Sequence, residues 1–232
     1  METAAHLAIS ERGMSAPIHP LMSRYLAAVL SGDRDEALRI VLEEGFRKGE
    51  SARVLDLDVV AATQREIGRL WQENKISVAD EHQATAISQI VLSHLYPSLE
   101  RAARVHKRVL VACVEGELHD MAARIATDLL DSYGFDTTFL GASCPTKELP
   151  PKIRQVKADA LALSVTMSFH VHAAEEAVRW LRTELPADFP IILGGEAAIA
   201  IPTSIEGAIV SRGTAADLAR ILREALDVPE VV

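Results

Sequence analysis

A glutamate and a histidine two residues apart form the first pair in this sequence whose side chains suggest chemistry. Glu117 and His119 follow the short apolar run at residues 108–113. A carboxylate that accepts a hydrogen bond from one imidazole nitrogen fixes the tautomer of the ring and makes the other nitrogen more basic. That arrangement is typical of a metal-binding histidine. Acidic residues are also common at a helix N-terminus, where the helix dipole favours them, so both interpretations stay open at this point.

The elements around this pair read as alternating strands and helices. The run at 108–113 (RVLVAC) is apolar and rich in valine, which predicts a buried parallel strand. Further strands are predicted at 136–140, 160–165, 190–193 and 208–210, with helices at 119–133, 146–157, 173–184 and 214–226. This alternation predicts an α/β domain with a doubly wound, flavodoxin-like or Rossmann-like, parallel five-stranded sheet. Ligands of such sheets bind beyond the carboxyl ends of the strands, at loops 114–118, 141–145, 166–172 and 194–198.

The first part of the chain is all-helical in pattern. From residue 21 to about residue 104, apolar residues recur at helical spacing in four segments with short connections. Ser31-Gly32 ends the first segment, and Asp33 is placed to cap the second. We therefore predict a four-helix bundle at 21–105, followed by the sheet domain at 106–232. Residues 1–20 lack periodicity and are predicted to form a disordered arm.

Composition limits the class of protein. The 232 residues are 49% hydrophobic and 25% charged, which is enough apolar content for a proper core. The 24 Lys and Arg against 33 Asp and Glu give a net charge of −9, which argues against a broad nucleic-acid or anionic membrane surface. Two cysteines are too few for a disulfide framework, and no apolar run approaches the roughly 20 residues of a membrane span. Without a secretion signal, we expect a cytoplasmic protein.

The segment E-L-H-D-M-A resembles the D-x-H-x-x-G signature of cobalamin-binding domains, with Glu117, His119 and Ala122 at the three signature positions. Further landmarks of that family follow in order, and together they cover nearly all of residues 107–227. They are Leu140-Gly141 before Pro145, Leu163-Ser164 before Ser168, and the paired glycines Gly194-Gly195.

The resemblance implies that the nucleotide tail of cobalamin enters the sheet domain and that His119 becomes the lower axial ligand of cobalt. It also implies a set of cofactor-binding residues in the loops: Glu117, Leu118, Ala122, Gly141, Ser164, Thr166, Ser168, Gly194 and Gly195. Glycines allow close approach of a flat heterocycle to the backbone. Ala122 replaces the usual glycine and adds a methyl group where the corrin edge would lie, and Glu117 replaces the usual aspartate and adds a methylene to the carboxylate arm.

Residues in the predicted bundle resemble one subgroup of cobalamin-binding proteins. Trp71 followed by Glu81-His82 resembles the helical cap of CarH-type B12-dependent photoreceptors, in which the tryptophan packs over the upper adenosyl group and the Glu-His pair lines the same chamber. Taken singly, each feature is better explained by structure, Trp71 as a core residue at a helix end and Glu81-His82 as a solvated first turn. Gln72 stands where those photoreceptors usually carry a histidine, so His82 is the nearest candidate for the upper cobalt ligand after photolysis, with water as the other option. We expect no helix-turn-helix domain before the bundle.

Several other residues carry weaker signals. His170 and His172 have the spacing of a metal pair on an extended segment, but a polar loop is the more common reading of that spacing, with a partner or second chromophore as further options. Cys113 is expected to be an inert core residue and Cys144 a structural one. Related stand-alone photoreceptors, the photocobilins, also bind a bilin, so a noncovalent bilin is a further expectation of the resemblance.

These observations predict a light-sensing or cobalamin-sensing signalling protein that is not an enzyme and carries adenosylcobalamin between its two domains. Light would cleave the cobalt–carbon bond and change the domain arrangement, the oligomer state or partner binding. The alternative is a corrinoid methyl carrier of a methyltransferase system, and a passive cobalamin carrier is the third option. We expect a homo-oligomer, a dimer or higher, with a downstream protein partner, and no direct contact with nucleic acid or membrane.

Overall fold

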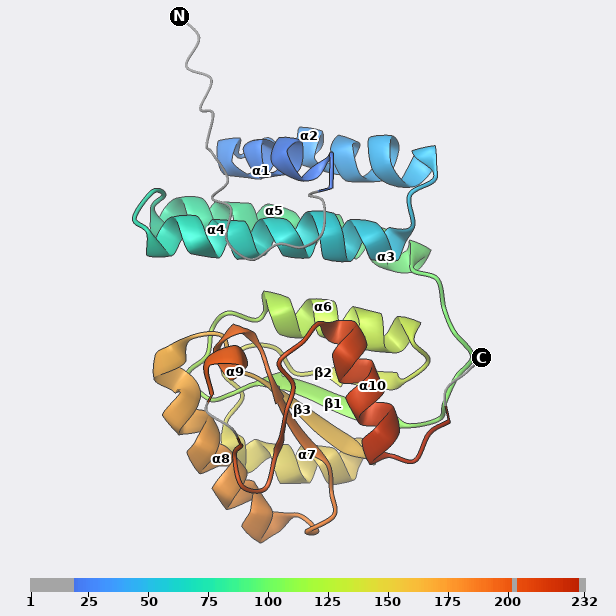
Figure 1. Ribbon diagram of the computed structural model, residues 1–232, viewed down its shortest axis with the longest axis vertical. Helices are drawn as coiled ribbons and strands as arrows, with labels where there is room; N and C mark the ends of the chain where they lie inside the picture. The colour runs from blue at the N-terminus through green and yellow to red at the C-terminus, as the bar shows by residue number, and fades with distance from the viewer. Residues whose placement is uncertain (1–18, 202–203, 230–232) are drawn as a thin grey trace, which may run out of the picture.

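The N-terminal part of the molecule is built from four helical rods. The structure is a computed structural model that describes residues 19–201 and 204–229 (Figure 1). The arm expected at residues 1–20 lies outside the described residues except for its last two. The helical elements are α1 (Met22–Ser31), α2 (Arg34–Leu38), η1 (Arg39–Gly45), η2 (Phe46–Lys48), α3 (Ala52–Val54), η3 (Leu55–Ala61), α4 (Ala62–Gln72), α5 (Val78–Leu95) and η4 (Tyr96–Ser98). Elements α2 to η2 follow one another without a break, as do α3 to α4, so the segments form four rods.

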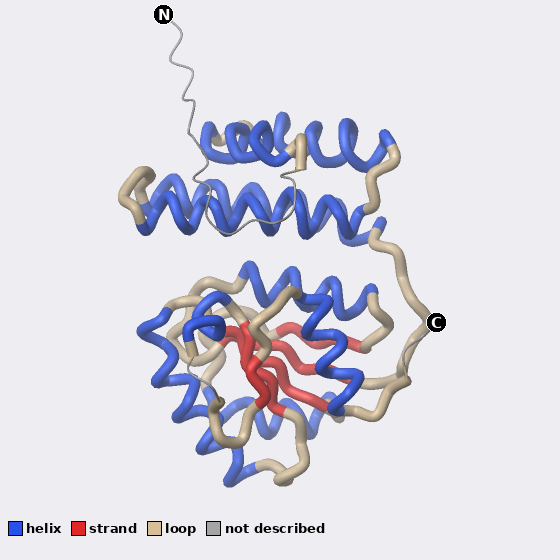
Figure 2. The backbone as a smooth tube through the Cα atoms, viewed as in Figure 1, coloured by secondary structure: helices blue, strands red, loops and turns tan. Residues whose placement is uncertain are grey.

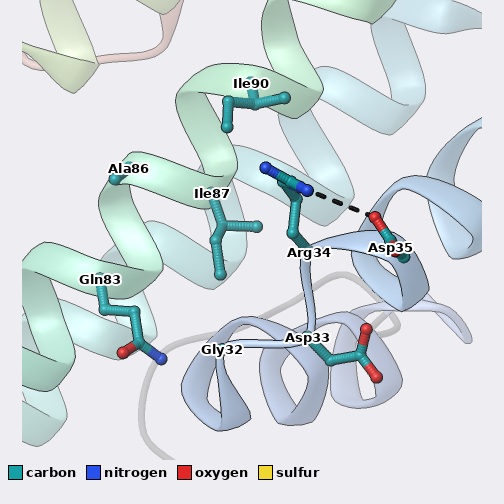
Figure 3. Close-up of a pocket in the computed structure, with 8 residues that line it drawn as sticks. All are labelled: Gly32, Asp33, Arg34, Asp35, Gln83, Ala86, Ile87 and Ile90. Carbon is teal, nitrogen blue, oxygen red and sulfur yellow. Dashed lines mark ion pairs between the residues drawn. The ribbon is translucent and has the colours of Figure 1, made fainter.

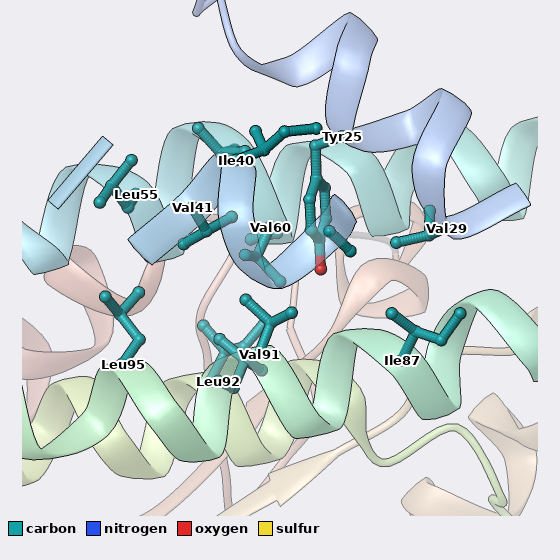
Figure 4. Packing of buried hydrophobic residues seen from close by; sticks show 14 of the residues in the cluster. Tyr25, Val29, Ile40, Val41, Leu55, Val60, Ile87, Val91, Leu92 and Leu95 are labelled. Atoms are coloured by element: carbon teal, nitrogen blue, oxygen red, sulfur yellow. The ribbon is translucent and has the colours of Figure 1, made fainter. Parts of the chain in front are cut away.

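Capping residues mark the starts of two of these rods. The Asp33 carboxylate accepts a hydrogen bond from the Glu36 backbone N–H at 2.9 Å and caps α2. Ser77 and Asp80 form a reciprocal capping box at the start of α5. Inside the bundle, one face of each rod contributes buried aliphatic side chains around the fully buried Tyr25 (Figure 4). The bundle is therefore held by burial of apolar area, which contributes about 25 cal/mol for each Å² removed from water.

The second part of the molecule is a five-stranded, wholly parallel sheet with the strand order β2-β1-β3-β4-β5. Its strands are β1 (Arg108–Cys113), β2 (Asp136–Phe139), β3 (Ala160–Ser164), β4 (Ile191–Gly194) and β5 (Ile209–Val210). Its helices are α6 (Met121–Ser132), η5 (Thr146–Glu148), α7 (Leu149–Val156), η6 (Ser168–His170), α8 (Val171–Glu184), α9 (Glu196–Ala200) and α10 (Ala215–Ala225). The predicted fold class, a helical cap followed by a doubly wound five-stranded sheet, is confirmed.

Alternate residues of the strands point to opposite faces of this sheet. One face packs on α7 and α8, with Leu110 and Leu161 among its buried residues. The opposite face packs on α6 and α10, with Val111 and Ala162 among its buried residues. Figure 2 shows the strands enclosed between helices on both sides. Because both faces are covered, the β-branched and aliphatic run at β1 is buried after its first residue.

Helix α6 joins the two domains because it buries side chains on two sides. Met121, Ile125 and Leu129 belong to the same core cluster as the bundle, whereas Ala123 and Leu130 pack on the sheet. In Figure 1, α6 lies between the layer of α4 and α5 and the strands. The cap and the sheet domain therefore share one helix, and the loop that precedes α6 lies at their junction.

The segment between the domains is fixed by a buried carboxylate on α6. Asp131 accepts hydrogen bonds from the Tyr96 hydroxyl at 3.0 Å and from the guanidinium groups of Arg101 and Arg104, both at 2.6 Å. These contacts hold the connection after α5 against the end of α6. Among the described residues, no helix is both long enough and apolar enough to cross a bilayer.

Candidate functional site

The carboxyl ends of the central strands meet at one edge of the sheet, where they bring the predicted loops together. In the register of the sheet, Cys113 of β1 pairs with Ser164 of β3, and Ser164 pairs with Gly194 of β4. The Cys113 backbone N–H also donates to the carbonyl of Gly141, after β2, at 3.0 Å. All four loops that were predicted to carry the site therefore start side by side.

Glu117 is the centre of this edge. Its side chain has no exposed surface. Oε1 accepts hydrogen bonds from the backbone N–H and from Nδ1 of His119, at 3.0 and 2.6 Å. Oε2 accepts from the backbone N–H groups of Thr166 and Met167, at 2.9 and 2.8 Å, and from Nδ1 of His170 at 3.1 Å. One buried carboxylate thus links the β1–α6 loop to the β3–α8 segment.

This environment keeps Glu117 ionised. Burial acts to raise the pKa of the carboxyl, but the hydrogen bonds from His119, Met167 and His170 act against it and hold the pKa well below its usual range. A carboxylate can only accept hydrogen bonds, so the ring nitrogens that contact it must be donors. Hydrogen-bond donors of the protein therefore compensate the negative charge of Glu117, whose side chain has no contact with solvent.

The imidazole of His119 is oriented by this carboxylate. With Nδ1 donating to Glu117, Nε2 of the neutral ring is left with a free lone pair. The hydrogen bond that His119 donates to Glu117 raises the pKa of the imidazole, burial lowers it in part, and the charge of Glu81 adds to the increase. The side chain is 37% exposed, so Nε2 is a basic, accessible nitrogen suited to a metal.

Two further positions lie at the carboxyl ends of the neighbouring strands β3 and β4. The hydroxyl of Ser164 is buried and has no hydrogen-bond partner in the structure. Gly195 has φ of +96°, and a Cβ at this position would lie 2.4 Å from the carbonyl oxygen of Val165. Only glycine fits there without displacing backbone. An unpaired buried hydroxyl costs stability, which points to a partner that a ligand supplies.

The cap approaches this edge from the other side through Trp71. The indole of Trp71, at the end of α4, has its ring centroid 6.3 Å from that of His119, with the two rings tilted by 38°. Glu81, on α5, is largely buried, whereas the neighbouring His82 is 73% exposed and its Nδ1 hydrogen-bonds the Glu81 carboxylate. The structure therefore brings Trp71 and Glu81 toward the loop edge and leaves most of the His82 ring in solvent.

Glu81 is held by hydrogen bonds that continue into the cap. The Thr85 hydroxyl is 2.9 Å from the Glu81 carboxylate and 3.1 Å from Oε1 of Gln64. Gln64 donates to the Ser88 hydroxyl at 2.7 Å, and the buried hydroxyl of Tyr25 donates to the same oxygen at 3.0 Å. A chain of polar contacts thus connects the face of the cap that looks at His119 with its interior.

The other predicted residues lie around this centre with differing exposure. Leu118 is 72% exposed, next to the buried Glu117. Ala122, in the first turn of α6, and Ser168, at the start of η6, are also exposed. The Thr166 hydroxyl lies 3.4 Å from the carbonyl of His119, close to the limit of a hydrogen bond. Gly141 and Gly194 have open space where a Cβ would lie.

The sequence analysis did not assign His170 to the site around Glu117, and it placed His172 in a loop. His170, interpreted as part of a polar loop, contacts Glu117. His172 does not lie in the loop, because η6 passes directly into α8, which begins at Val171, two residues before the predicted start. Its side chain is 76% exposed and faces Glu175 and Glu176. The position of His170 in a loop at the carboxyl end of β3 was the signal that could have found it.

Two hollows in the surface lie away from the Glu117–His119 pair. One, of about 500 Å³, lies between the α1–α2 turn and α5, where Ile87 and Ile90 face Arg34 (Figure 3). The other, of about 470 Å³, lies beside Trp180 of α8. None of the predicted binding residues lines either hollow. The described residues contain no group of three or more His, Cys, Asp or Glu side chains placed to hold a metal ion.

A buried carboxylate that orients an accessible imidazole, on a doubly wound sheet under a helical cap, defines a cofactor-binding class of protein. Two family models, each described as a B12 binding domain, match the chain, one over residues 107–223 and the other over residues 21–96. The first spans half of the chain. The protein belongs to the B12-binding domain family and binds cobalamin.

Individual relatives are more distant. The chain is 27% identical over 195 residues to the HTH-type transcriptional repressor CarH of Myxococcus xanthus, covering 82% of this chain but only 64% of the length of that relative. It is 26% identical to dimethylamine corrinoid protein 1 of Methanosarcina acetivorans, covering 77% of this chain and 84% of that protein. The structure of the Methanosarcina barkeri monomethylamine corrinoid protein superposes with a TM-score of 0.74 at 19% identity, covering 90% of this chain and 98% of that chain, and so has the same fold.

The residues at the sheet edge fit a cobalt corrinoid. A corrinoid brings most of its own metal donors, so the protein would have to supply a single further one, and Nε2 of His119 is chemically suited to that role. The unpartnered hydroxyl of Ser164 and the open space beside Gly194 suit a flat heterocycle with hydrogen-bonding atoms. These groups all lie at or just after the carboxyl ends of adjacent strands, on one edge of the sheet.

Proposed function

We propose that this protein is an adenosylcobalamin-binding photoreceptor that signals through a change in the arrangement of its two domains. The observation that carries the proposal is Trp71, which stands opposite His119 with 6.3 Å between the ring centroids. Any group on the upper side of the cofactor would contact an indole and the Glu81 carboxylate. A chamber closed by a large aromatic ring suits a bulky upper ligand that is retained in the dark. The resemblance of the cap to CarH-type photoreceptors supports the same function.

Each residue has a role in this proposal. His119 would supply Nε2 to cobalt, and Glu117 holds the ring in the tautomer that leaves this nitrogen free. Ser164 and Gly194 accommodate the nucleotide tail, and Gly195 lets the backbone pack closely on Val165. Trp71 and Glu81 enclose the upper group, and when bound, adenosylcobalamin supplies a cobalt–carbon bond that visible light breaks. Without that group, Trp71 is free to approach His119, and the cap moves with it.

The movement provides an output because the cap and the sheet domain share α6. A shift of α4 against the loop that precedes α6 changes which surfaces of the two domains are exposed, which is the kind of two-state element that a ligand switch needs. We propose that the output is a change in a homo-oligomer or in binding of a partner protein, and that the chain itself is not a catalyst. His82, most of whose ring is in solvent, would have to rotate inward to bind cobalt after photolysis. A noncovalent bilin remains part of the proposal as a second chromophore.

A corrinoid methyl carrier is the second candidate. It is favoured by similarity, because the chain is 26% identical to dimethylamine corrinoid protein 1, nearly the same identity as the 27% to CarH. A carrier has to present its upper face to two partner enzymes in turn. The position of Trp71 over His119 is less suited to that exchange, so we place the sensor first.

The decisive experiment is reconstitution of the apoprotein with adenosylcobalamin in the dark, followed by absorbance spectra and size-exclusion chromatography before and after green light. We expect a dark-stable complex, photolysis, and a change in elution volume. Photolysis without any change in elution or in interdomain distance would contradict signalling. Stable methylcobalamin binding, with transfer of the methyl group to a thiol by an added corrinoid methyltransferase, would favour the carrier.

Two variants test the site in the same experiment. His119→Ala should remove the spectrum of the histidine-ligated form, because the axial nitrogen is lost. His94→Ala, an exposed histidine on α5, is the matched control and should behave as the wild type. An unchanged spectrum in His119→Ala would overturn the proposed site.

A further inference from the structure

A second histidine contacts Glu117 from the opposite side to His119. His170 lies at the end of η6, its Nδ1 is 3.1 Å from Oε2 of Glu117, and its side chain is 19% exposed. The ring of Phe169 packs against it edge-on, with 4.4 Å between the centroids. On its other side, Nε2 of His170 lies over Gly116, where a Cβ would be 3.4 Å away. The ring is therefore held in a defined place between two neighbours.

The direction of the hydrogen bond follows from the chemistry of the carboxylate. The Glu117 oxygens already accept from the backbone N–H groups of His119, Thr166 and Met167, so the carboxylate is the acceptor and Nδ1 of His170 is the donor. Both histidines thus donate from Nδ1 to the same carboxylate, His119 to Oε1 and His170 to Oε2. The two oxygens of a carboxylate move together, so a contact that fixes Oε2 also fixes Oε1.

Among the described residues, His170 is the one side chain of the β3–α8 segment that binds Glu117. The other donors from this segment are the backbone N–H groups of Thr166 and Met167. These backbone groups restrain the same oxygen, but their positions change with the conformation of the loop. A side-chain donor at the start of α8, supported by Phe169, attaches the carboxylate to a regular element of the sheet domain.

We propose that His170 is a positioning residue for the axial ligand, which acts through Glu117 to keep Nε2 of His119 directed at cobalt. The proposal deepens the assigned function, because it rests on cobalamin ligation by His119. Without the His170 contact, the carboxylate can rotate and His119 can turn with it. The dimethylbenzimidazole of the cofactor then competes with the histidine for the lower position.

The test compares three variants with the wild type, all labelled with ¹⁵N-histidine and reconstituted with cobalamin that is reduced to cob(II)alamin. His170→Ala removes the donor. His170→Asn keeps an N–H near the position of Nδ1 and should rescue the contact. His172→Ala, two residues further on and in contact with surface glutamates only, is the matched control. The readouts are the nitrogen splitting in the EPR spectrum and the Kd for hydroxocobalamin.

We expect His170→Ala to bind hydroxocobalamin about 10-fold more weakly, at the lower end of the effect of outer-sphere partners on metal affinity. Its EPR spectrum should mix the ¹⁵N doublet of histidine with the ¹⁴N triplet of dimethylbenzimidazole. His170→Asn and His172→Ala should give the ¹⁵N doublet alone. Equal affinity and equal spectra for His170→Ala and the wild type would overturn the proposal, as would a failure of His170→Asn to improve on His170→Ala.

Failure of the underlying site would look different. A ¹⁴N triplet in the wild type itself would refute ligation by His119, whatever His170 does. The apoprotein gives an independent reading, because ¹⁵N NMR distinguishes the two tautomers of each ring. Nδ1-protonated rings for both His119 and His170 support the proposed hydrogen bonds, and an Nε2-protonated His170 would overturn the role of that residue without reference to any cofactor.

Discussion

The indole of Trp71 and the imidazole of His119 face each other across the junction of the two domains, with 6.3 Å between the ring centroids. If His119 binds the metal, the non-bonded spacing of about 3.5–4 Å applies between the macrocycle and the indole, and together with the imidazole this already takes up the 6.3 Å. An upper ligand needs further room. The domain arrangement in the structure is therefore the closed one, and the cofactor needs a more open one.

Cobalamin binding is expected to move α5 away from the sheet domain. Spin labels at Ser93→Cys on α5 and Lys157→Cys after α7, both exposed positions, should report a longer distance in the adenosylcobalamin complex than in the apoprotein. The measurement is double electron–electron resonance in a Cys144→Ser background. Labels at Ser93 and Gln83, which lie on the same helix, provide the control and should show no change. An unchanged Ser93–Lys157 distance would contradict the opening.

Glu117→Gln is expected to destabilise the apoprotein by about 2–4 kcal/mol, because an amide NH₂ in either position faces N–H donors that have no other acceptor. Glu115→Gln is the matched control. Its carboxylate is exposed and accepts one hydrogen bond, from the backbone N–H of Thr146, so its loss should cost less than about 1 kcal/mol. Urea unfolding measures both. Equal effects would show that the buried carboxylate is not the centre of the loop edge.

Ser164→Ala is expected to have opposite effects on stability and binding. In the apoprotein the change removes an unpaired buried hydroxyl and should leave the free energy of unfolding equal or up to about 1 kcal/mol higher. Cobalamin affinity should fall, because the tail loses a hydrogen-bonding partner. Ser88→Ala is the contrasting control, since Tyr25 and Gln64 both donate to its hydroxyl and its loss should destabilise the fold. Calorimetric titration with cobalamin and urea unfolding give the two quantities, and unaltered cobalamin affinity would remove Ser164 from the site.

Asp56 is expected to make the stability of the protein fall as pH rises from about 4 to about 7. Its side chain is buried in η3, and burial together with the charge of Asp128 on α6 raises its pKa to about 7. The folded state therefore binds a proton that the unfolded state releases near pH 4. The contribution is complete below that pH and is lost as pH rises through the folded pKa, by up to about 1.4 kcal/mol per pH unit.

The pH series compares the wild type with Asp56→Asn, which should remove this slope, and with Asp58→Asn, an exposed neighbour that should keep it. The charged groups around Asp128 also include Arg124, Asp131 and Arg101, so Asp128→Asn belongs in the series. The measurement is urea unfolding at pH 4.5 to 7.5. The same slope in the wild type and Asp56→Asn would show that this carboxyl does not titrate with folding.

The sequence was sufficient to predict the sheet, the bundle and the Glu117–His119 pair, because each depends on local patterns. Strand periodicity, the Asp33 cap and a two-residue spacing are all set within a few residues. The role of His170 depends on how the chain turns through η6 after β3, which places a ring against a carboxylate 53 positions earlier in the sequence. No local pattern encodes that contact.

The side chains of Glu81 and His82 point in different directions because of helix geometry. Successive residues of an α-helix point about 100° apart, so two neighbours on α5 do not face the same chamber. Glu81 is turned toward Thr85 and the domain junction, whereas 73% of the His82 side chain remains exposed. A pair that reads as one motif in the sequence occupies two sides of the helix.

The two-sided burial of α6 limits how the domains of this protein can be exchanged with those of other proteins. Met121, Ile125 and Leu129 fill the cap, so a hybrid joined in the linker at residues 100–107 would graft the bundle onto a foreign helix surface. Such hybrids should aggregate or bind cobalamin poorly unless these three side chains are transplanted with the bundle. The functional unit of exchange is the bundle plus one face of a helix that belongs, by topology, to the other domain.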